Sequence, residues 1–294
     1  RPRHLANLKV GDGIFATVPE GADCKHGGNP TSTGGDEPAR CVTITRMRID
    51  SLFARHEPLF SFEFFPPRDD QGAERLFATI AGRYDFITRF LSYGQDRRWK
   101  RRLIDRARLT QADRVLDLAC GTGDLLCAAA SRARSAVGLD LTHRMLQLAA
   151  RRRPTSTLVT GDMLALPFGR SRLDPVMIGY GLRNVPDLER AIAEIHRVLA
   201  DGGRMLSLDF NKPTNALVRA AYLTYLTVVG SVLGFALHGD PNTYRYIPES
   251  IRVYPGAAGV ARLLERGGFA DVEVIPLLGG LMAIHVARKC PTPN

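Results

Sequence analysis

Two closely spaced glycines after a strand-like run constrain this chain more than any other feature of its sequence. The run is Arg114–Leu118, the glycines are Gly121 and Gly123, and a helical pattern follows over Asp124–Arg132. A strand, a tight glycine turn and a helix form the opening unit of a nucleotide-binding α/β domain. Leu126 stands where a dinucleotide-binding turn has its third glycine, and the Lys-Ser/Thr pair of a phosphate-binding loop is missing. The turn therefore favours a ligand without phosphates.

From about residue 77 the chain alternates between strand-like and helical patterns. The strand-like runs are Arg114–Leu118, Ala136–Asp140, Thr157–Thr160, Pro175–Tyr180, Arg204–Asp209, Ala270–Ile275 and Met282–Ala287. Helical patterns cover Tyr84–Leu103, Asp124–Arg132, His143–Arg151 and Leu188–Leu199. This order predicts a Rossmann-like α/β fold with a mostly parallel seven-stranded sheet and an antiparallel C-terminal edge strand. It is the shape of class I methyltransferases, whose methyl donor, S-adenosylmethionine, has no phosphates.

The first 75 residues differ in composition from the rest. Residues 1–46 are rich in Gly, Pro, Thr and Ser, and we interpret them as a disordered or mis-annotated leader with Met47 as a candidate start. Residues 47–75 contain a β-prone run, Leu59–Pro67. This stretch resembles the N-terminus of methylenetetrahydrofolate reductases, which would make Glu63 an acidic catalytic residue. One strand cannot form that family's barrel, so we interpret 47–75 as a remnant and 76–290 as the methyltransferase domain.

Charge and cysteine content narrow the class of protein. The net charge is +10 and the pI about 9.7, which suits nucleic acid or an anionic membrane. No RNP, zinc-finger or basic-zipper signature is present, so we expect no nucleic-acid partner. The basic cluster around Trp99 is either a solvated helix face or a membrane-facing patch. Five widely spaced Cys without a C-x-x-C pair predict a reduced cytoplasmic protein without disulfides or a metal.

Residues at the carboxyl ends of the strands are the candidate ligand contacts, because open α/β sheets bind ligands there. Asp140 ends the second strand, where a carboxylate can accept hydrogen bonds from both hydroxyls of a ribose. Asp162 can accept from an adenine amino group, and Met163 can pack on the ring. The alternatives are a plain tight turn for the glycines, an N-cap for Asp140 and a turn residue for Asp162. Gly179–Asn184 would lie between the donor and its acceptor.

Between about residues 77 and 289 the chain resembles the bacterial ubiquinone/menaquinone-biosynthesis C-methyltransferases. The segments that carry the resemblance are Tyr84-Asp85, Leu91–Gly94, Trp99-Lys100, the glycine turn, Ala165–Phe168, Gly181–Val185, Gly202–Arg204 and Tyr244–Ile251. The resemblance implies that S-adenosylmethionine contacts Thr122, Asp140, Asp162, Met163 and Gly179, and we add Asp117, Gly121 and Gly123 to this set. Many members carry Ser at Gly179 and His at Asp96. We therefore expect only a backbone contact at Gly179.

The implied reaction transfers a methyl group from a sulfonium to a carbon of an electron-rich quinol ring. The protein must orient that carbon and stabilise a phenolate-like oxygen. Arg183 is the candidate for the oxygen contact because its guanidinium stays charged. Asn184 is the candidate to orient Arg183, and Tyr84 to relay a proton. The alternatives are an Arg183 that bonds backbone carbonyls and a Tyr84 that fills the core. His238 is an outlying candidate for the base.

The implied substrate is a polyprenyl quinol lipid. Ala220–Gly239 contains no Asp, Glu, Lys or Arg and is nearly long enough to span a bilayer. Four interpretations of this segment stay open: a core helix, a membrane span, an interfacial helix and a helix that lines an isoprenoid cavity. With the net positive charge, we expect a cytoplasmic protein that associates peripherally with the inner membrane face. A homo-oligomer and a quinone-synthesis complex are the assemblies left open.

Three other functions are weighed against this one. Another small-molecule methyltransferase is disfavoured by Gly181–Val185 and Tyr244–Ile251. A non-catalytic S-adenosylmethionine-binding subunit of a quinone-synthesis complex is disfavoured because Asp140, Asp162 and Arg183 are all present. A folate reductase is disfavoured by the missing barrel. The acceptor is either demethylmenaquinol, which general likeness favours, or the polyprenyl-methoxybenzoquinol precursor of ubiquinone.

Overall fold

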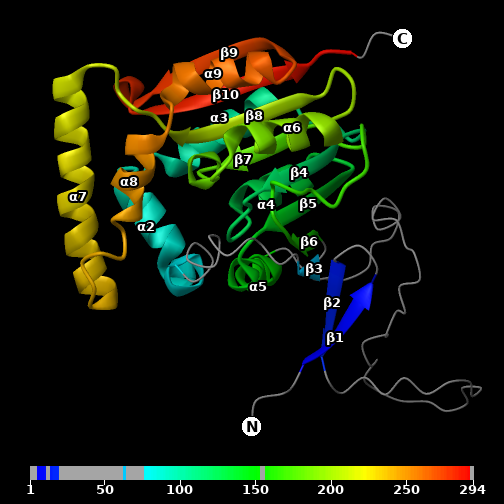
Figure 1. Cartoon of the computed structure of the whole chain (residues 1–294), viewed down its shortest axis with the longest axis horizontal. Helices are drawn as coiled ribbons and strands as arrows, with labels where there is room; N and C mark the ends of the chain where they lie inside the picture. Colours follow the sequence, from blue (N-terminus) through cyan, green and yellow to red (C-terminus); the bar gives the residue numbers. More distant parts are fainter. Residues whose placement is uncertain (1–4, 11–13, 20–61, 64–75, 153–155, 292–294) are drawn as a thin grey trace, which may run out of the picture.

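A seven-stranded sheet organises the chain, as Figure 1 shows for this computed structural model, which describes residues 5–10, 14–19, 62–63, 76–152 and 156–291. The strand order is β6-β5-β4-β7-β8-β10-β9. The strands are β4 (Arg114–Leu118), β5 (Ser135–Asp140), β6 (Thr157–Thr160), β7 (Val176–Gly179), β8 (Arg204–Phe210), β9 (Phe269–Leu277) and β10 (Met282–Lys289). The first five pair in parallel, and β10 runs antiparallel to both β8 and β9. The predicted fold class is confirmed.

Helices cover both faces of the sheet, which is why its central strands are apolar on both sides. Neighbouring residues of β4 point to opposite faces, and Val115 and Leu116 are both fully buried. The Val115 face packs against α3 (Asp96–Ala107), α4 (Asp124–Ala130) and α5 (His143–Arg152). The Leu116 face packs against α6 (Leu188–Val198) and α9 (Gly256–Arg266). The carboxyl ends of the parallel strands therefore stay open for a ligand.

The helical pattern predicted over Tyr84–Leu103 is two helices rather than one. α2 (Tyr84–Leu91) ends at a turn, and α3 starts at Asp96. Gly94 has φ +73° in that turn, a left-handed conformation that ends a helix at little cost when the residue is glycine. The hydroxyl of Ser92 then accepts a hydrogen bond from the backbone N–H of Asp96 at 3.1 Å, which fixes the start of α3.

Two further details differ from the predicted boundaries. Pro175 precedes β7, which begins at Val176, so its missing N–H falls outside the strand pairing. The helices α8 (Tyr246–Val253) and α9 follow α7 (Ala216–His238) in the chain and cover residues for which no helix was predicted. Short 3₁₀ turns cover Ala81–Arg83, Leu182–Asn184 and Leu278–Gly280.

The N-terminal region contributes a small antiparallel sheet of β1 (Leu5–Val10), β2 (Ile14–Pro19) and β3 (Phe62–Glu63). The strands β1 and β2 lie within the segment interpreted as a leader, and β3 lies within the predicted β-prone run. The remainder of residues 1–75 lies outside the described residues. The interpretations of 1–46 as a leader and of 47–75 as a reductase-like remnant therefore stay predictions.

The uncharged segment at Ala220–Gly239 belongs to α7 (Ala216–His238), and in the described part of the chain this one helix is long and apolar enough to cross a membrane. Its buried residues are Tyr222, Leu226, Gly230 and Gly234, one narrow stripe of a 23-residue helix. The interpretation of α7 as an ordinary core helix is therefore wrong. A Cβ at Gly234 would lie 2.5 Å from the carbonyl oxygen of Asp240, so glycine is needed for this close approach.

Candidate functional site

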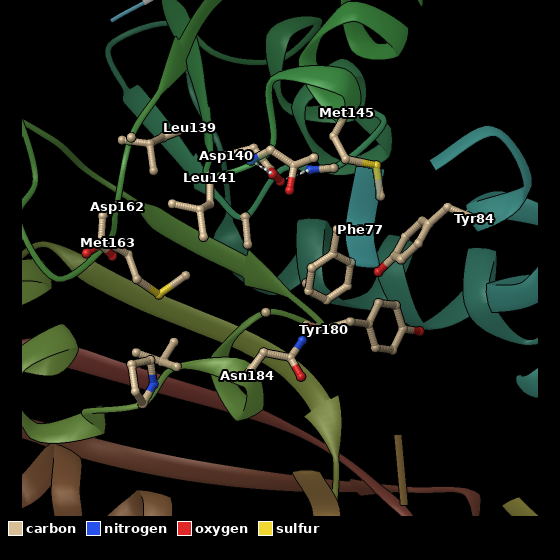
Figure 2. Close-up of a pocket in the computed structure, with 18 residues that line it drawn as sticks. Phe77, Tyr84, Leu139, Asp140, Leu141, Met145, Asp162, Met163, Tyr180 and Asn184 are labelled. Atoms are coloured by element: carbon tan, nitrogen blue, oxygen red, sulfur yellow. Dashed lines mark hydrogen bonds between the residues drawn. The ribbon is translucent and has the colours of Figure 1, made fainter. Parts of the chain in front are cut away.

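A pocket opens at the carboxyl ends of β4 to β7, where the sequence analysis expects the ligand (Figure 2). We call it the first pocket. Among the residues that line it are the predicted contacts Gly121, Asp140, Asp162, Met163, Gly179, Asn184 and Tyr84, together with Phe77, Leu141, Met145 and Tyr180. Side chains from four strand ends and from the segment that leads into α2 thus converge on one cavity.

The glycine turn is fastened to the end of β5 by Asp140. Gly121 and Gly123 have φ values of +54° and +85°, so both turn residues use conformations that favour glycine. The Asp140 carboxylate accepts hydrogen bonds from the backbone N–H groups of Gly121 and Thr142, each at 2.8 Å. These partners precede α5, so Asp140 does not act as the N-cap of that helix. Burial outweighs the two hydrogen bonds and raises the pKa of Asp140 to about 6.

Asp162 is a turn residue that also lines the first pocket, so its two expected roles are compatible. Its carboxylate accepts a hydrogen bond from the backbone N–H of Leu164 at 2.8 Å, which is a turn contact, and it also lines the first pocket. Gly179 has no side chain, so it can contact a ligand only through its backbone. A Cβ at this position would lie 2.8 Å from the Leu125 side chain. The geometry at Gly179 thus agrees with the backbone contact that the resemblance implies.

A polar recess adjoins the first pocket behind the glycine turn. It is lined by Tyr84, Lys100, Asp117, Ala119, Cys120, Gly121, Thr122, Asp124, Leu125, Gly179 and Tyr180. Asp117 is 1% exposed, and neither of its carboxylate oxygens makes a hydrogen bond of good geometry. Burial raises the pKa of Asp117 to about 8. A buried carboxyl group without partners in a recess is a candidate ligand contact.

Lys100 is a charged residue of this recess for which the sequence predicted no role in ligand binding. Its ammonium lies 2.9 Å from Asp96 and 2.8 Å from Asp124. Burial lowers the pKa of Lys100, but the two carboxylates outweigh it and raise that pKa overall. In the sequence, Lys100 belongs to a basic cluster that is equally typical of a solvated helix face. Its position next to Trp99, in one of the segments that carry the family resemblance, was the one indication of a role in the site.

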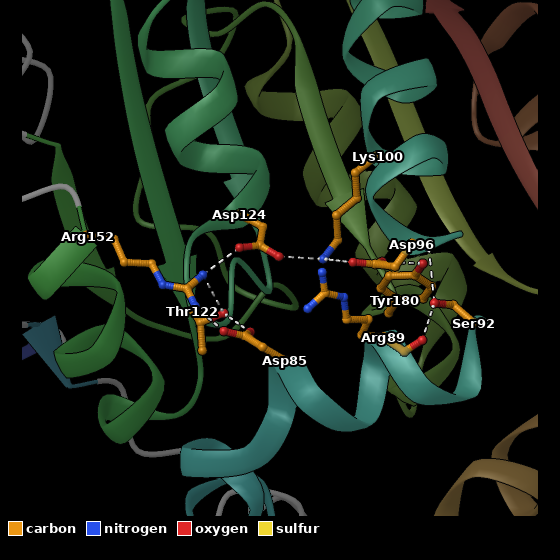
Figure 3. A network of polar contacts seen from close by, with 9 residues as sticks. All are labelled: Asp85, Arg89, Ser92, Asp96, Lys100, Thr122, Asp124, Arg152 and Tyr180. Atoms are coloured by element: carbon orange, nitrogen blue, oxygen red, sulfur yellow. Dashed lines mark hydrogen bonds and ion pairs between the residues drawn. The ribbon is translucent and has the colours of Figure 1, made fainter. Parts of the chain in front are cut away.

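A network of polar contacts ties α2 to the glycine turn and to α5 (Figure 3). The hydroxyl of Thr122 donates to the Asp85 carboxylate on α2 at 2.6 Å. Arg152, at the end of α5, pairs with both Asp85 and Asp124. Lys100 continues the network to Asp96, whose carboxylate accepts a hydrogen bond from the Tyr180 hydroxyl at 2.7 Å. The network holds α2 beside the first pocket.

A second pocket adjoins the first and is mainly aromatic and apolar. Its lining includes Ile80, Ile87, Leu91, Tyr93, Trp99, Phe210, Tyr222, Tyr225, Tyr246, Ile247, Leu278, Leu281 and Met282, with Arg183 as its one charged residue. Tyr84 and Tyr180 line both pockets. The two cavities therefore meet at these tyrosines, which is the arrangement that a two-substrate transfer needs.

Arg183 is held in place from several sides. Its Nη1 donates to Oδ1 of Asp209 at 2.8 Å and to the carbonyl of Tyr180 at 2.7 Å. Its guanidinium lies 4.6 Å from the Phe210 ring centroid. Burial alone would lower the pKa of Arg183, and the Asp209 carboxylate more than reverses this, so the pKa is raised. The contacts that the structural alternative expects for Arg183 are thus present, and its buried Nε has no hydrogen-bond partner among the described residues.

The other predicted catalytic residues occupy different positions. Asn184 donates to the same Tyr180 carbonyl at 3.3 Å and lines the first pocket, so it does not orient Arg183 directly. Tyr84 lines both pockets rather than filling the core, and burial raises its pKa, so its hydroxyl stays protonated. His238 accepts or donates at the Tyr244 hydroxyl, 2.8 Å away, and lines neither pocket. In the described residues, no three His, Cys, Asp or Glu side chains form a candidate metal group.

Similar proteins point to the same fold and chemistry. A relative named demethylmenaquinone methyltransferase from Thermus thermophilus is 40% identical over 220 residues, covering 73% of this chain and 100% of that protein. One of the same name from Mycolicibacterium gilvum is 39% identical over 214 residues, covering 73% and 93%.

Solved structures support the fold. A Haloferax volcanii complex of the Trm112 methyltransferase activator with a methyltransferase contains a chain with TM-score 0.54 and 19% identity, covering 73% of this chain and 97% of that one. An S-adenosylmethionine-dependent methyltransferase from Thermotoga maritima has TM-score 0.52 and 16% identity, covering 74% and 99%. The profile of the ubiE/COQ5 methyltransferase family matches residues 67–289. The paired pockets, the strand-end residues and this match together show that the chain belongs to the ubiE/COQ5 methyltransferase family.

Proposed function

We propose that this protein transfers the methyl group of S-adenosylmethionine to a ring carbon of a polyprenyl hydroquinone, with demethylmenaquinol as the first candidate. The observation that carries the proposal is the aromatic second pocket, which meets the first pocket at Tyr84 and Tyr180. The names of the relatives favour demethylmenaquinol over the benzoquinol precursor of ubiquinone. A non-catalytic subunit would not need a second pocket of this kind.

The residues of the first pocket and of the recess fit S-adenosylmethionine. Asp140, Asp162 and Met163 all line the first pocket, and in this proposal Asp140 accepts hydrogen bonds from ribose hydroxyls while Asp162 and Met163 contact the adenine. The recess offers Lys100 to a carboxylate and Asp117 to an ammonium, and Asp117, whose pKa burial raises to about 8, would ionise as the ammonium binds. A free amino acid group carries both charges, which supports the recess as its site.

The second pocket's own residues supply the orientation and charge that ring methylation requires. S-adenosylmethionine, when bound, supplies an electrophilic methyl group on its sulfonium. The aromatic walls hold a flat ring, and the guanidinium of Arg183 in the pocket lining donates to an acceptor oxygen that becomes phenolate-like. Tyr84 stays protonated, so it can donate or accept a hydrogen bond there but does not act as a phenolate base. Overall the ring loses one hydrogen as a proton and gains one methyl group.

Binding of S-adenosylmethionine is expected to weaken as the pH falls below about 8. Burial raises the pKa of Asp117 to about 8 and that of Asp140 to about 6 in the free protein, so each carboxyl is mainly the neutral acid below its own pKa. Only the ionised carboxylates pair with the ammonium of the ligand and accept from both ribose hydroxyls, so Kd should rise by up to about tenfold per pH unit between 8 and 6 and more steeply below 6. Calorimetry across this range measures it, and Asp140→Asn is the control that should lose only the additional rise below pH 6.

The location proposed is the cytoplasmic face of the inner membrane, with peripheral attachment. A polyprenyl substrate stays in the bilayer, and the +10 net charge favours an anionic surface. Whether the protein acts as a homo-oligomer or within a quinone-synthesis complex stays a prediction.

Quinone profiling tests the proposal. The full chain is expressed in a host that lacks its own quinone C-methyltransferase, and lipid extracts are analysed by mass spectrometry. We expect demethylmenaquinone to be converted to menaquinone, and no conversion with Asp140→Ala. Conversion of the benzoquinone precursor alone would move the assignment to the ubiquinone branch. No conversion by folded protein that binds S-adenosylmethionine would favour the non-catalytic subunit.

A further inference from the structure

The outer side of α7 exposes large apolar side chains in its first turn and over its last three turns, with Ala221 and Thr224 exposed between them, which is unusual for a surface helix. Leu217 is 82% exposed, Val232 62% and Phe235 68%, and Val228 lies between them on the same side. The helix is about 35 Å long, and its one charged residue, Arg219, is in the first turn. In Figure 1 α7 forms one edge of the molecule, with α8 on its inner side.

A second exposed row, on α2, runs beside α7. Phe86, Phe90 and Tyr93 share one face of that region, and the Tyr93 ring stacks on Tyr225 of α7 with centroids 5.9 Å apart. At the other end, the guanidinium of Arg83 donates to the carbonyl of Leu237 near the end of α7. The two helices are therefore antiparallel neighbours. We call their combined exposed side chains, Leu217, Val228, Val232, Phe235, Phe86, Phe90 and Tyr93, the apolar edge.

The second pocket reaches this edge. Tyr93 and Tyr225, which join the two helices, also line the pocket, and so does Leu278, which is 40% exposed. Arg183 is a buried part of the pocket lining, whereas Tyr93 and Leu278 are exposed, so the side at Tyr93, Tyr225 and Leu278 is the outer side of the pocket. A chain attached to a bound ring would therefore leave the pocket beside the apolar edge.

The charges next to the edge favour an anionic partner. Residues 83–106, which include α2 and α3, contain eight Lys or Arg and three Asp. Arg83, directly before α2, and Arg89 on α2 are exposed. Two copies of the chain that met through this edge would bring like-charged arginines together, which opposes association. An apolar strip with basic neighbours matches the interface of an anionic bilayer.

We infer that the apolar edge docks on an anionic lipid bilayer and that a lipid acceptor passes from the bilayer into the second pocket between Tyr93, Tyr225 and Leu278. The docking step stands on exposure and charge alone. The passage step rests on the proposed function. The side chains of α7 and α2 enter the interface to the depth of the acyl boundary, and α7 lies along the membrane plane.

Vesicle sedimentation of the full chain, without any quinone, tests the docking step. Wild-type protein should pellet with vesicles of equal parts phosphatidylglycerol and phosphatidylcholine, and less with pure phosphatidylcholine. The double variant Val232→Glu with Phe235→Glu should partition at least about tenfold more weakly. Val274→Glu is the matched control, because Val274 is also exposed but lies on β9. Thermal unfolding and S-adenosylmethionine binding check the fold, with Val228→Glu alone as the milder replacement.

A second assay separates this inference from the proposed function. Methylation of a short-tailed demethylated quinol in solution should be the same for wild type and for the double variant, because neither changed residue lines a pocket. Loss of that reaction in both proteins would refute the proposed function and leave the docking result standing. If wild-type protein sediments with neither kind of vesicle, the inference is refuted. A wild-type dimer that the double variant converts to a monomer while its vesicle binding is unchanged also refutes it.

Discussion

Replacing Asp140 with Asn is expected to lower the affinity for S-adenosylmethionine by about a hundredfold and to destabilise the fold by about 1–3 kcal/mol. The substitution removes the charge and one of the acceptor sites that ribose hydroxyls would use, and charge-assisted hydrogen bonds contribute about 1.5–3 kcal/mol each. The fold weakens because the NH2 group of Asn cannot accept from Gly121 or Thr142, whose N–H groups bond the two carboxylate oxygens. Isothermal calorimetry and urea unfolding measure the two effects.

Asp105→Asn is the matched control for that variant. Asp105 is an exposed carboxylate on α3 whose partner is Arg132, and it lines neither pocket. Its substitution should leave both affinity and stability within error of wild type, since exposed ion pairs contribute little. An Asp140→Asn protein that binds as tightly as wild type would remove the carboxylate from donor recognition.

Replacing Arg183 with Ala is expected to destabilise the protein by about 3–5 kcal/mol. The side chains of Arg183 and Asp209 are 3% and 2% exposed, so the single change leaves Asp209 as a buried charge without its partner. Chemical unfolding at neutral pH measures the loss. Turnover of this variant falls partly because the fold weakens, so the single change alone cannot assign a catalytic role.

The double variant Arg183→Met with Asp209→Asn separates stability from catalysis. It removes both charges and should recover most of the lost stability, as replacement of buried ion pairs by neutral groups often does. Binding of S-adenosylmethionine should stay near wild type, while turnover should be at least about a hundredfold lower, the usual cost of removing one donor to a developing oxyanion. Turnover close to wild type in this variant would exclude Arg183 from the chemistry.

The strands and the positions of the cofactor candidates could be predicted because both follow from local patterns. Apolar runs set β4 to β8 within about a residue, and ligand-binding residues follow strand ends by the geometry of the fold. The break between α2 and α3 was missed although Gly94 was visible, because the apolar period continues past it. An isolated glycine in a helical pattern does not by itself end a helix.

The side-chain partners could not be predicted, because no local pattern relates residues so far apart. Asp209 follows Arg183 by 26 positions and Thr122 follows Asp85 by 37. Only the order of strands in space brings β8 beside the residues after β7, and α2 beside the glycine turn. The burial of Lys100 could not be predicted for a related reason, since a buried lysine and a solvated lysine cannot be distinguished within a run of basic residues.

The ion pair of Asp85 with Arg152 has a consequence for how the protein responds to salt. Its side chains are about two-fifths exposed, so dissolved salt screens this pair far more than it screens the buried Arg183–Asp209 pair. The pair joins α2 to α5 beside the first pocket, which Tyr84 of α2 lines. A rise in ionic strength should therefore loosen this wall of the first pocket while it leaves the arginine of the second pocket in place.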